Sequence, residues 1–369
     1  MIKVLVTGAG GFIGKNLLVH LRARPEYEVD TLCRGDAPGA LAAKVASADF
    51  IFHLAGVNRP ESVEQFAQGN TDLTRRLCDA VRATGRGIPI VFSSSIQAAV
   101  ENPYGVSKRA AEEALHALAS AQGAAPVYVY RLPNVFGKWC RPNYNSAVAT
   151  FCHNIVNDLP VSIHDPQAMI RLVYIDDVVA DFLRVLAQRP TGGERAVAPE
   201  YAISVGGLAE QLNKFKDSRL SLVSEAVGTG LVRALYSTYI SYFRPEQFTY
   251  PLVKHEDPRG VFVEMLKTPD AGQFSYFTAH PGITRGGHYH HTKTEKFLVI
   301  KGQARFGFRH IDTGDTYSVD TDGATPVVVE TVPGWSHDIT NVGTDDMVVM
   351  LWANEIFDRG APDTINYKV

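Results

Sequence analysis

The chain has 369 residues, of which 45% are hydrophobic, and this length and composition allow two domains with substantial cores. The formal net charge of −3 gives no basic field for nucleic acid, and no apolar run approaches the length of a membrane span. Because the four cysteines are scattered and the first residues form a strand-like run without a signal-peptide pattern, we expect free thiols and a cytoplasmic protein.

A glycine-rich turn follows the first predicted strand. Residues 3–6, a lysine followed by Val-Leu-Val, form a short, mostly apolar strand, and a helical pattern runs from Lys15 to Ala23. Between them the glycines recur every third residue, which permits a tight turn and close approach of a pyrophosphate to a helix N-terminus. We therefore predict a dinucleotide site, whose contacts include Gly8, Gly11, Phe12, Ile13 and Gly14.

The second predicted strand, residues 29–33, is followed by Arg34. Sites for NAD usually carry an acid here, about 20 residues beyond the glycines, whereas a cation suits the 2′-phosphate of NADP. Arg34 therefore favours NADP. Asp30 and Asp36 lie nearby in the sequence and leave NAD as the alternative.

The third predicted strand, residues 49–56, ends in Leu54, Ala55 and Gly56. Small residues at a strand exit let a flat cofactor lie close to the backbone, so these three residues are predicted cofactor contacts. Asn70, at the start of the next predicted helix, is a further candidate. We interpret His53 as a packed strand residue rather than a catalyst.

A hydroxyl triplet, residues 93–95, ends the next predicted strand and is followed by Tyr104 and Lys108. Residues four apart share a helix face, so the ammonium can lie beside the phenol and lower its pKa. With a serine to hold a substrate oxygen, this is a general acid/base device for an alcohol or ketone. A buried Tyr and an exposed Lys on an ordinary helix are the alternative.

Alternating strands and helices predict an α/β Rossmann-type doubly wound parallel sheet, with ligands at the carboxyl ends of its strands. After residues 236–243 the helical pattern gives way to short strands and turns, which predict an all-β sandwich or jelly roll. We place the boundary at Arg244, which gives domains of residues 1–244 and 245–369. Strands are predicted at 262–266, 273–278, 295–300, 303–310, 326–332 and 347–352.

The second half also contains a candidate metal site. His288 and His290 are two residues apart, so on a strand they share a face, where Glu295 and His337 can join them from other strands. Three imidazoles and one carboxylate suit a first-row metal, for which Zn²⁺ is the expected ion. A metal-free barrel with a polar interior is the alternative, and His291 should point to the opposite face.

The motifs of the first half resemble those of extended short-chain dehydrogenase/reductases that modify nucleotide sugars. The resemblance implies that Tyr104 is the acid/base, that Lys108 is its pKa partner and a ribose ligand, and that Ser95, or less favourably Ser94, is the catalytic hydroxyl. It also implies that the sugar nucleotide contacts a set of polar residues: Asn134, Lys138, Arg141, Asn145 and, for the phosphates, Arg171. A structural salt bridge is the alternative role for Arg171.

The spacing from Gly282 to Gly302, followed by Pro333 and His337, resembles the cupins. Residues 257–264 and 285–289 further resemble cupin-type nucleotide-ketosugar epimerases, in which the equivalent of His288 is a base. Here the complete metal pattern makes that role doubtful. Lys296, Tyr289 or metal-bound water are then the candidate bases.

Together the two halves resemble bifunctional capsular-polysaccharide enzymes of UDP-N-acetyl-L-fucosamine biosynthesis. The resemblance implies C3 epimerisation of a UDP-2-acetamido-2,6-dideoxy-4-hexulose by the cupin, and NADPH-dependent reduction at C4 to UDP-N-acetyl-6-deoxy-L-talosamine. It also implies a homodimer. The alternative is an NAD-dependent 4-epimerase or dehydratase with a structural or ligand-sensing cupin.

Overall fold

The computed structural model describes residues 1–33, 35–37, 39–121, 126–253, 255–257, 260–262, 265–266, 268, 272–355 and 360–369. The described chain forms two compact units. Unit 1 contains residues 1–146 and 170–202, and unit 2 contains residues 147–169 and 203–369. The predicted domain boundary at Arg244 remains a prediction; Arg244 itself precedes a short 3-10 turn, Pro245–Gln247.

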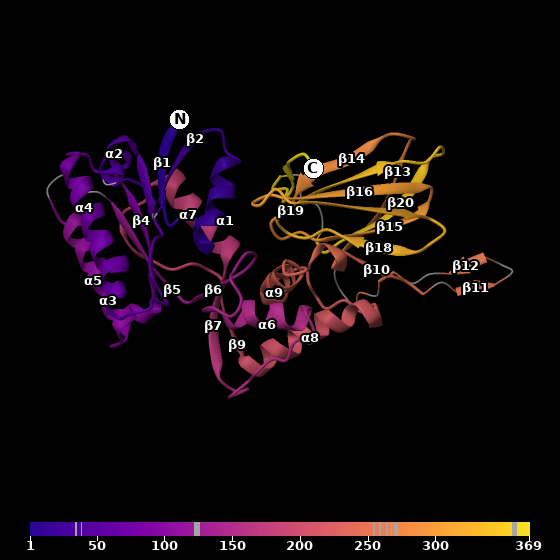
Figure 1. Ribbon diagram of the computed structural model, residues 1–369, viewed down its shortest axis with the longest axis horizontal. Helices are drawn as coiled ribbons and strands as arrows, with labels where there is room; N and C mark the ends of the chain where they lie inside the picture. Colours follow the sequence, from indigo (N-terminus) through magenta and orange to yellow (C-terminus); the bar gives the residue numbers. More distant parts are fainter. Residues whose placement is uncertain are drawn as a thin grey trace. The chain divides into compact units, whose positions relative to one another are not determined.

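Unit 1 is built on a six-stranded parallel sheet with the order β2-β1-β3-β4-β5-β8 (Figure 1). The central strands are apolar and buried, as expected for a sheet covered on both faces. The predicted Rossmann-type doubly wound sheet is therefore confirmed. The strands are β1 (Ile2–Thr7), β2 (Tyr27–Leu32), β3 (Phe50–His53), β4 (Ile90–Ser95), β5 (Val127–Leu132) and β8 (Gly193–Arg195).

The helices of this unit connect the parallel strands. They are α1 (Phe12–Arg22), α2 (Ala40–Ser47), α3 (Glu64–Phe66), α4 (Leu73–Ala83), α5 (Pro103–Ala119) and α7 (Ile175–Gln188), with a π-helical turn at Ala67–Asp72 and a 3-10 turn at Ile96–Ala99. A second, three-stranded sheet contains β6 (Asn134–Phe136), β7 (Met169–Tyr174) and β9 (Glu200–Ser204).

Unit 2 combines three helices with two five-stranded antiparallel sheets (Figure 1). The helices are α6 (Ala147–Val156), α8 (Val205–Ser221) and α9 (Gly230–Ile240). One sheet has the order β10-β18-β15-β20-β13, with strands Thr249–Pro251, Val327–Glu330, Glu295–Lys301, Met347–Ala353 and Gln273–Ala279. The other has the order β17-β16-β19-β14-β21, with strands Thr316–Asp322, Gln303–His310, Trp335–Asn341, Thr284–Tyr289 and Ile365–Asn366. A small hairpin joins β11 (His255–Asp257) and β12 (Gly260–Phe262).

The predicted all-β jelly roll is confirmed, but five strands of its two sheets, β10, β14, β17, β19 and β21, lie outside the predicted ranges. The sequences of the three longer ones, β14, β17 and β19, are TRGGHY, TYSVDTD and WSHDITN; they are rich in polar residues and lack a run of large apolar side chains. Two of them carry inward-facing histidines where an ordinary strand would carry apolar residues. The hydrophobic pattern on which strand prediction rests is therefore weak at these places.

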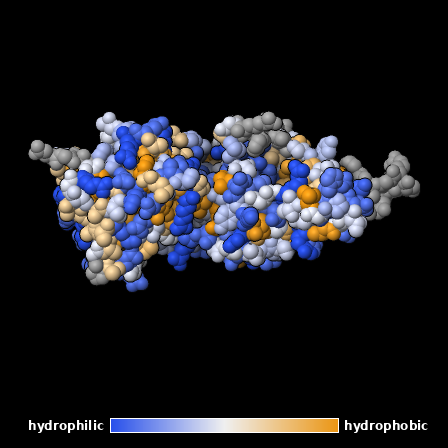
Figure 2. Space-filling model, turned by 90° about the horizontal axis from the view of Figure 1, so that it is seen from above, coloured by the Kyte–Doolittle hydropathy of each residue, from blue (hydrophilic) through white to orange (hydrophobic). Residues whose placement is uncertain are grey.

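Among the described residues, we find no helix with both the length and the apolarity needed to cross a bilayer. The hydrophobic side chains visible in Figure 2 lie in small separate groups between hydrophilic ones. Single apolar side chains of this kind are normal on a protein surface.

Candidate active sites

The glycine turn between β1 and α1 fits a flat ligand against the backbone. Gly8 has φ +72°, and a Cβ added to it would lie 2.5 Å from the backbone nitrogen of Ala55. A Cβ on Gly14 would lie 2.3 Å from the Gly8 carbonyl oxygen. No described side chain caps the start of α1, so its first-turn amides suit a phosphate. The predicted dinucleotide contacts therefore form one continuous turn beside the exit of β3.

Arg34 lies outside the described residues, so the preference for NADP remains a prediction. The two nearby acids are described. Lys44 on α2 donates to Asp30 at 2.8 Å, and its ammonium lies 3.7 Å from Asp36. Lys44 is a cation near the end of β2 that the sequence analysis missed, because its helix follows the strand at no fixed spacing.

Asn70 corrects one expectation. It does not open a helix but lies in the π-helical turn between α3 and α4, and it is buried. Its Nδ2 donates to the Val57 carbonyl and to Ser107 Oγ, both at 2.9 Å, and its Oδ1 accepts from the Val57 amide at 2.8 Å. Both amide hydrogens are thus used. The geometry favours a role in joining the β3 exit, including Gly56, to α5, rather than a direct cofactor contact.

Ser95, Tyr104 and Lys108 come together at the carboxyl end of β4. The Ser95 side chain lies close enough to Tyr104 to act on the pKa of its phenol, which it lowers. The Lys108 ammonium is buried, donates to the Ser93 carbonyl at 2.9 Å and lies 6.0 Å from the centre of the Tyr104 ring.

The electrostatics of this trio differ from the sequence expectation. Burial raises the pKa of Tyr104, against a smaller lowering by Ser95, whereas the sequence predicted a lowered value. Burial lowers the pKa of Lys108 to about 8, opposed by the charge of Glu112. The reason is that burial removes both groups from water, which disfavours the charged form of each. Tyr104 is thus held as a protonated donor.

Ser94 is engaged elsewhere. Its hydroxyl donates to Glu112. The same carboxylate accepts from two guanidinium nitrogens of Arg131, Nη2 at 2.7 Å and Nε at 3.1 Å. This supports the preference for Ser95 over Ser94. Glu112 was missed by the sequence analysis, although its position four residues after Lys108 places it on the same face of α5.

His53 is a packed residue, in line with the interpretation from sequence. Its Nδ1 and Nε2 lie 2.8 Å from the hydroxyls of Thr7 and Thr74. Burial, with a smaller effect from Lys108, lowers the pKa of His53 to about 3, so it is neutral at physiological pH.

Two predicted substrate contacts are bound within the protein. Lys138 is buried, and its ammonium lies 2.7 and 3.0 Å from the carboxylate oxygens of Asp176, which supports a structural role rather than the predicted contact with the sugar. Arg171 forms a bidentate ion pair with Glu200: its Nε donates to Oε1, and its Nη2 donates to Oε2 at 2.8 Å. This is the alternative role considered for Arg171.

The other three predicted substrate contacts are exposed. Asn134 donates to the Arg171 carbonyl at 3.0 Å and so joins β6 to β7. The Arg141 guanidinium lies 5.2 Å from the Tyr144 ring centre. Arg141 and Asn145 therefore retain accessible polar groups in the loop after Gly137, and their contact with substrate remains a prediction.

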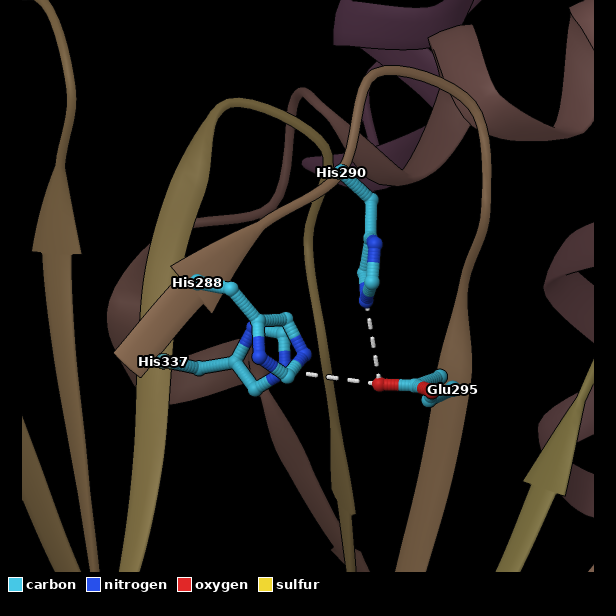
Figure 3. Close-up of side chains that lie close together, drawn as sticks. All are labelled: His288, His290, Glu295 and His337. Carbon is cyan, nitrogen blue, oxygen red and sulfur yellow. Dashed lines mark hydrogen bonds and ion pairs between the residues drawn. The ribbon is translucent and has the colours of Figure 1, made fainter. Parts of the chain in front are cut away.

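In unit 2, the four predicted metal ligands converge (Figure 3). One ligand atom from each of His288, His290, Glu295 and His337 lies within 4.8 Å of the others. Glu295 Oε2 lies 3.1 Å from His290 Nε2 and 3.3 Å from His337 Nε2. The side chains come from β14, the loop after it and β15, which follow one another in the sequence, and from β19, which comes later in the chain.

The charge state of this cluster suits a cation. Burial, with the neighbouring histidines, lowers the pKa of His288 to about 3, and burial also lowers the pKa of His337. Burial raises the pKa of Glu295, but the hydrogen bonds and charges of His290 and His337 hold it well below its usual value. The cluster thus offers imidazole nitrogens and a carboxylate, the donors that Zn²⁺ takes in proteins.

Lys293 is a further residue at this cluster, and the sequence analysis missed it. It is buried, and its ammonium lies 3.0 Å from Glu295 Oε1, the oxygen not facing His290. Lys296, suggested as a base, instead pairs with Glu330. Although burial lowers the pKa of Lys296, the charge of Glu330 outweighs it and raises the pKa overall, so Lys296 is a poor base.

Tyr289, the other suggested side-chain base, is buried against two aromatic rings. Its ring centre lies 5.3 Å from that of His291 and 6.0 Å from that of Tyr367. As the strand neighbour of His288, it belongs to the opposite face of β14. The geometry therefore does not favour Tyr289 as the base at the cluster.

Comparisons with known proteins agree with this architecture. Residues 4–198 match the NAD dependent epimerase/dehydratase family, and residues 255–365 match the polysaccharide biosynthesis C-terminal domain. A Pseudomonas aeruginosa protein named UDP-2-acetamido-2,6-beta-L-arabino-hexul-4-ose reductase is 62% identical over 364 residues, which cover 98% of each chain.

Two solved structures extend the comparison. The capsular polysaccharide assembling protein CapF from Staphylococcus aureus is 40% identical, with a TM-score of 0.68 over 99% of this chain and 100% of that one. UDP-glucuronic acid 4-epimerase from Bacillus cereus, 20% identical, matches 65% of this chain and 96% of its own with a TM-score of 0.56, which shows the fold alone. The chain therefore belongs to the NAD dependent epimerase/dehydratase family and, through both of its domains, to the CapF-like enzymes within it.

Proposed function

We propose that the chain is a bifunctional nucleotide-sugar enzyme. Its barrel epimerises C3 of a UDP-2-acetamido-2,6-dideoxy-4-hexulose, and its Rossmann unit reduces the C4 ketone with NADPH to UDP-N-acetyl-6-deoxy-L-talosamine. The observation that carries the proposal is the placement of Ser95 and Lys108 around Tyr104, in a chain 62% identical to a protein named as a 4-ketosugar reductase. The product belongs to the capsule or O-antigen route to UDP-N-acetyl-L-fucosamine.

The chemistry of unit 1 follows from its protonation states. When bound, the cofactor supplies a hydride to the carbonyl carbon at C4. The Tyr104 hydroxyl donates its proton to the C4 oxygen, and its raised pKa keeps that proton in place at neutral pH. Ser95 orients the same oxygen, and the charge of Lys108 favours the phenolate that remains. The glycine cradle at Gly8 and Gly14 supports a dinucleotide in this unit.

The proposed role of the barrel rests on its four converging side chains. His288, His290, Glu295 and His337 would hold a metal, for which we propose Zn²⁺. A bound metal would supply Lewis-acid polarisation of the C4 carbonyl. The proton at C3 is acidic only while C4 is a ketone, so epimerisation precedes reduction.

The other partners are also proposals. Arg141 and Asn145 are the accessible candidates for contact with the UDP-sugar. For the cofactor 2′-phosphate, the candidates are Arg34, which the sequence predicts, and Lys44 on α2. The homodimer and the cytoplasmic location expected from the sequence remain predictions.

Incubation of the protein with the UDP-4-hexulose in D₂O, followed by NMR, tests both steps. Without NADPH, we expect deuterium at C3; with NADPH, we expect cofactor oxidation and a C4 alcohol. If C3 gains no deuterium, the epimerase half is wrong, and if NADPH is not consumed, the reductase half is wrong.

A further inference from the structure

The C-terminal segment lies against the strand that carries His288. Its short strand β21 pairs with β14, and Asn366 stands opposite His288. The Tyr367 amide donates to the Gly287 carbonyl at 2.8 Å. One edge of the ligand-bearing strand is therefore covered by the last residues of the chain.

Asp363 of this segment holds the backbone of the loop between β14 and β15. Its carboxylate accepts from three consecutive amides, those of His291 at 2.9 Å, Thr292 at 2.7 Å and Lys293 at 2.8 Å. It also accepts from the Thr292 hydroxyl at 3.0 Å. Buried amides need acceptors, so one side chain satisfies most of this turn.

The same residue also orients a proposed ligand. The Nδ1 of His290 donates to the carbonyl oxygen of Asp363, which can only accept. With Nδ1 held at this carbonyl, Nε2 of His290 is directed into the cluster, where it lies 3.1 Å from Glu295 Oε2.

Other elements hold the remaining part of the loop. The Thr292 carbonyl accepts from Ser237 on α9 at 2.7 Å, and the Thr294 amide donates to Asn354 at 2.9 Å. These contacts do not reach His290. Among the described residues, its ring orientation rests on the Asp363 carbonyl and on the cluster itself.

We propose that Asp363 is a positioning residue for the barrel's metal site. Through its carboxylate it sets the path of residues 291–293, and through its carbonyl it sets the tautomer and direction of His290. It thereby also places Lys293 at the second oxygen of Glu295. This inference rests on the proposed metal site. Hydrogen-bond partners of this kind typically change metal affinity by about 10- to 100-fold.

The test is Zn²⁺ affinity of the full chain, measured by competition with a chromophoric chelator. We expect Asp363→Ala to weaken binding by about 10- to 100-fold and Asp363→Asn to weaken it less, since the amide keeps one acceptor oxygen. Asp320→Ala is the matched control, because Asp320 is an exposed partner of Arg305 on β17, a strand without a ligand. It should bind Zn²⁺ like the wild type.

Co²⁺ absorption provides a second readout that a purely structural role would not move, since the spectrum reports the ligand geometry. We expect a changed spectrum in Asp363→Asn and in Asp363→Ala, and the Asn variant decides if the Ala variant does not fold. Wild-type affinity and spectrum in the folded variants would overturn the proposal. Absence of Zn²⁺ binding by the wild type would instead overturn the metal site itself, and the positioning role with it.

Discussion

The two candidate sites differ in how their parts are assembled. In the barrel, four side chains from three strands and a loop already converge within 4.8 Å. In unit 1, the key pair comes from a single helix, and the Lys108 ammonium lies 6.0 Å from the Tyr104 ring while it donates to the Ser93 carbonyl. The barrel cluster is thus set by tertiary contacts, whereas the reductase pair is set by helix spacing and tuned by burial.

This difference suggests how each site fails when it is altered. Removal of one barrel ligand should abolish a shared property of the cluster, the binding of a cation. Changes in unit 1 should act separately, since Tyr104 donates the proton, Lys108 supplies the positive charge and the glycine turn fits the cofactor. The following predictions test this contrast.

Tyr104→Phe should have the largest effect, a loss of about 10²- to 10⁴-fold in the rate of C4 reduction, because it removes the proton donor. Deuterium exchange at C3 should continue at the wild-type rate. NADPH oxidation and NMR of the sugar measure the two steps. A normal reduction rate would contradict the role of Tyr104.

His290→Ala should remove bound Zn²⁺ and C3 exchange together, because a cluster of four ligands loses one of its buried members. Metal content after dialysis and exchange in D₂O are the measurements. The matched control is His280→Ala, since His280 is exposed and pairs with Asp346 on the surface. Retention of metal in the His290 variant would contradict the assignment.

Gly14→Ala should weaken cofactor binding and cost about 1–3 kcal/mol of stability, because the new Cβ would lie 2.3 Å from the Gly8 carbonyl oxygen. Gly10→Ala is the control in the same turn, since a Cβ there would have no heavy atom within 4 Å among those of the described chain. Cofactor titration and thermal unfolding compare the two. Equal behaviour of both variants would show that the turn is not closely packed.

The smallest effect should be on pH dependence. Burial lowers the pKa of Lys108 to about 8, so its charge is present below that pH and is lost as pH rises through it. C4 reduction should therefore decline above about pH 8. Lys108→Arg, whose guanidinium stays charged, should shift this decline to higher pH. A profile that is identical in both proteins would assign the decline to another group.

Features that depend on local spacing could be predicted from the sequence. The glycine turn, the Tyr104–Lys108 face of α5 and the pair His288 and His290 follow from periods of about two to four residues. Glu295 and His337 were predicted because their spacing resembles that of a known barrel. His288, Glu295 and His337 lie on strands as expected, whereas His290 lies in the loop after β14 and still joins the cluster.

Features that depend on burial or on distant contacts could not be predicted. Lys138 forms an ion pair with Asp176, which is distant in the sequence. Asp363 likewise accepts hydrogen bonds from a loop that precedes it by many residues. The raised pKa of Tyr104 results from the burial of its phenol, and not from Lys108 four residues further along α5. The sequence placed His288 and His337 on strands, but the polar residues of β14 and β19 gave no hydrophobic pattern from which to predict the strand ranges.

The central claim is that one chain holds two separate catalytic sites, one for each of two adjacent carbons. The most direct measurement is NMR of the UDP-4-hexulose in D₂O with Tyr104→Phe and His290→Ala side by side, with and without NADPH. We predict deuterium at C3 without reduction for the Tyr104 variant, and no C3 exchange for the His290 variant. Loss of C3 exchange in the Tyr104 variant, or wild-type exchange in the His290 variant, would contradict the account.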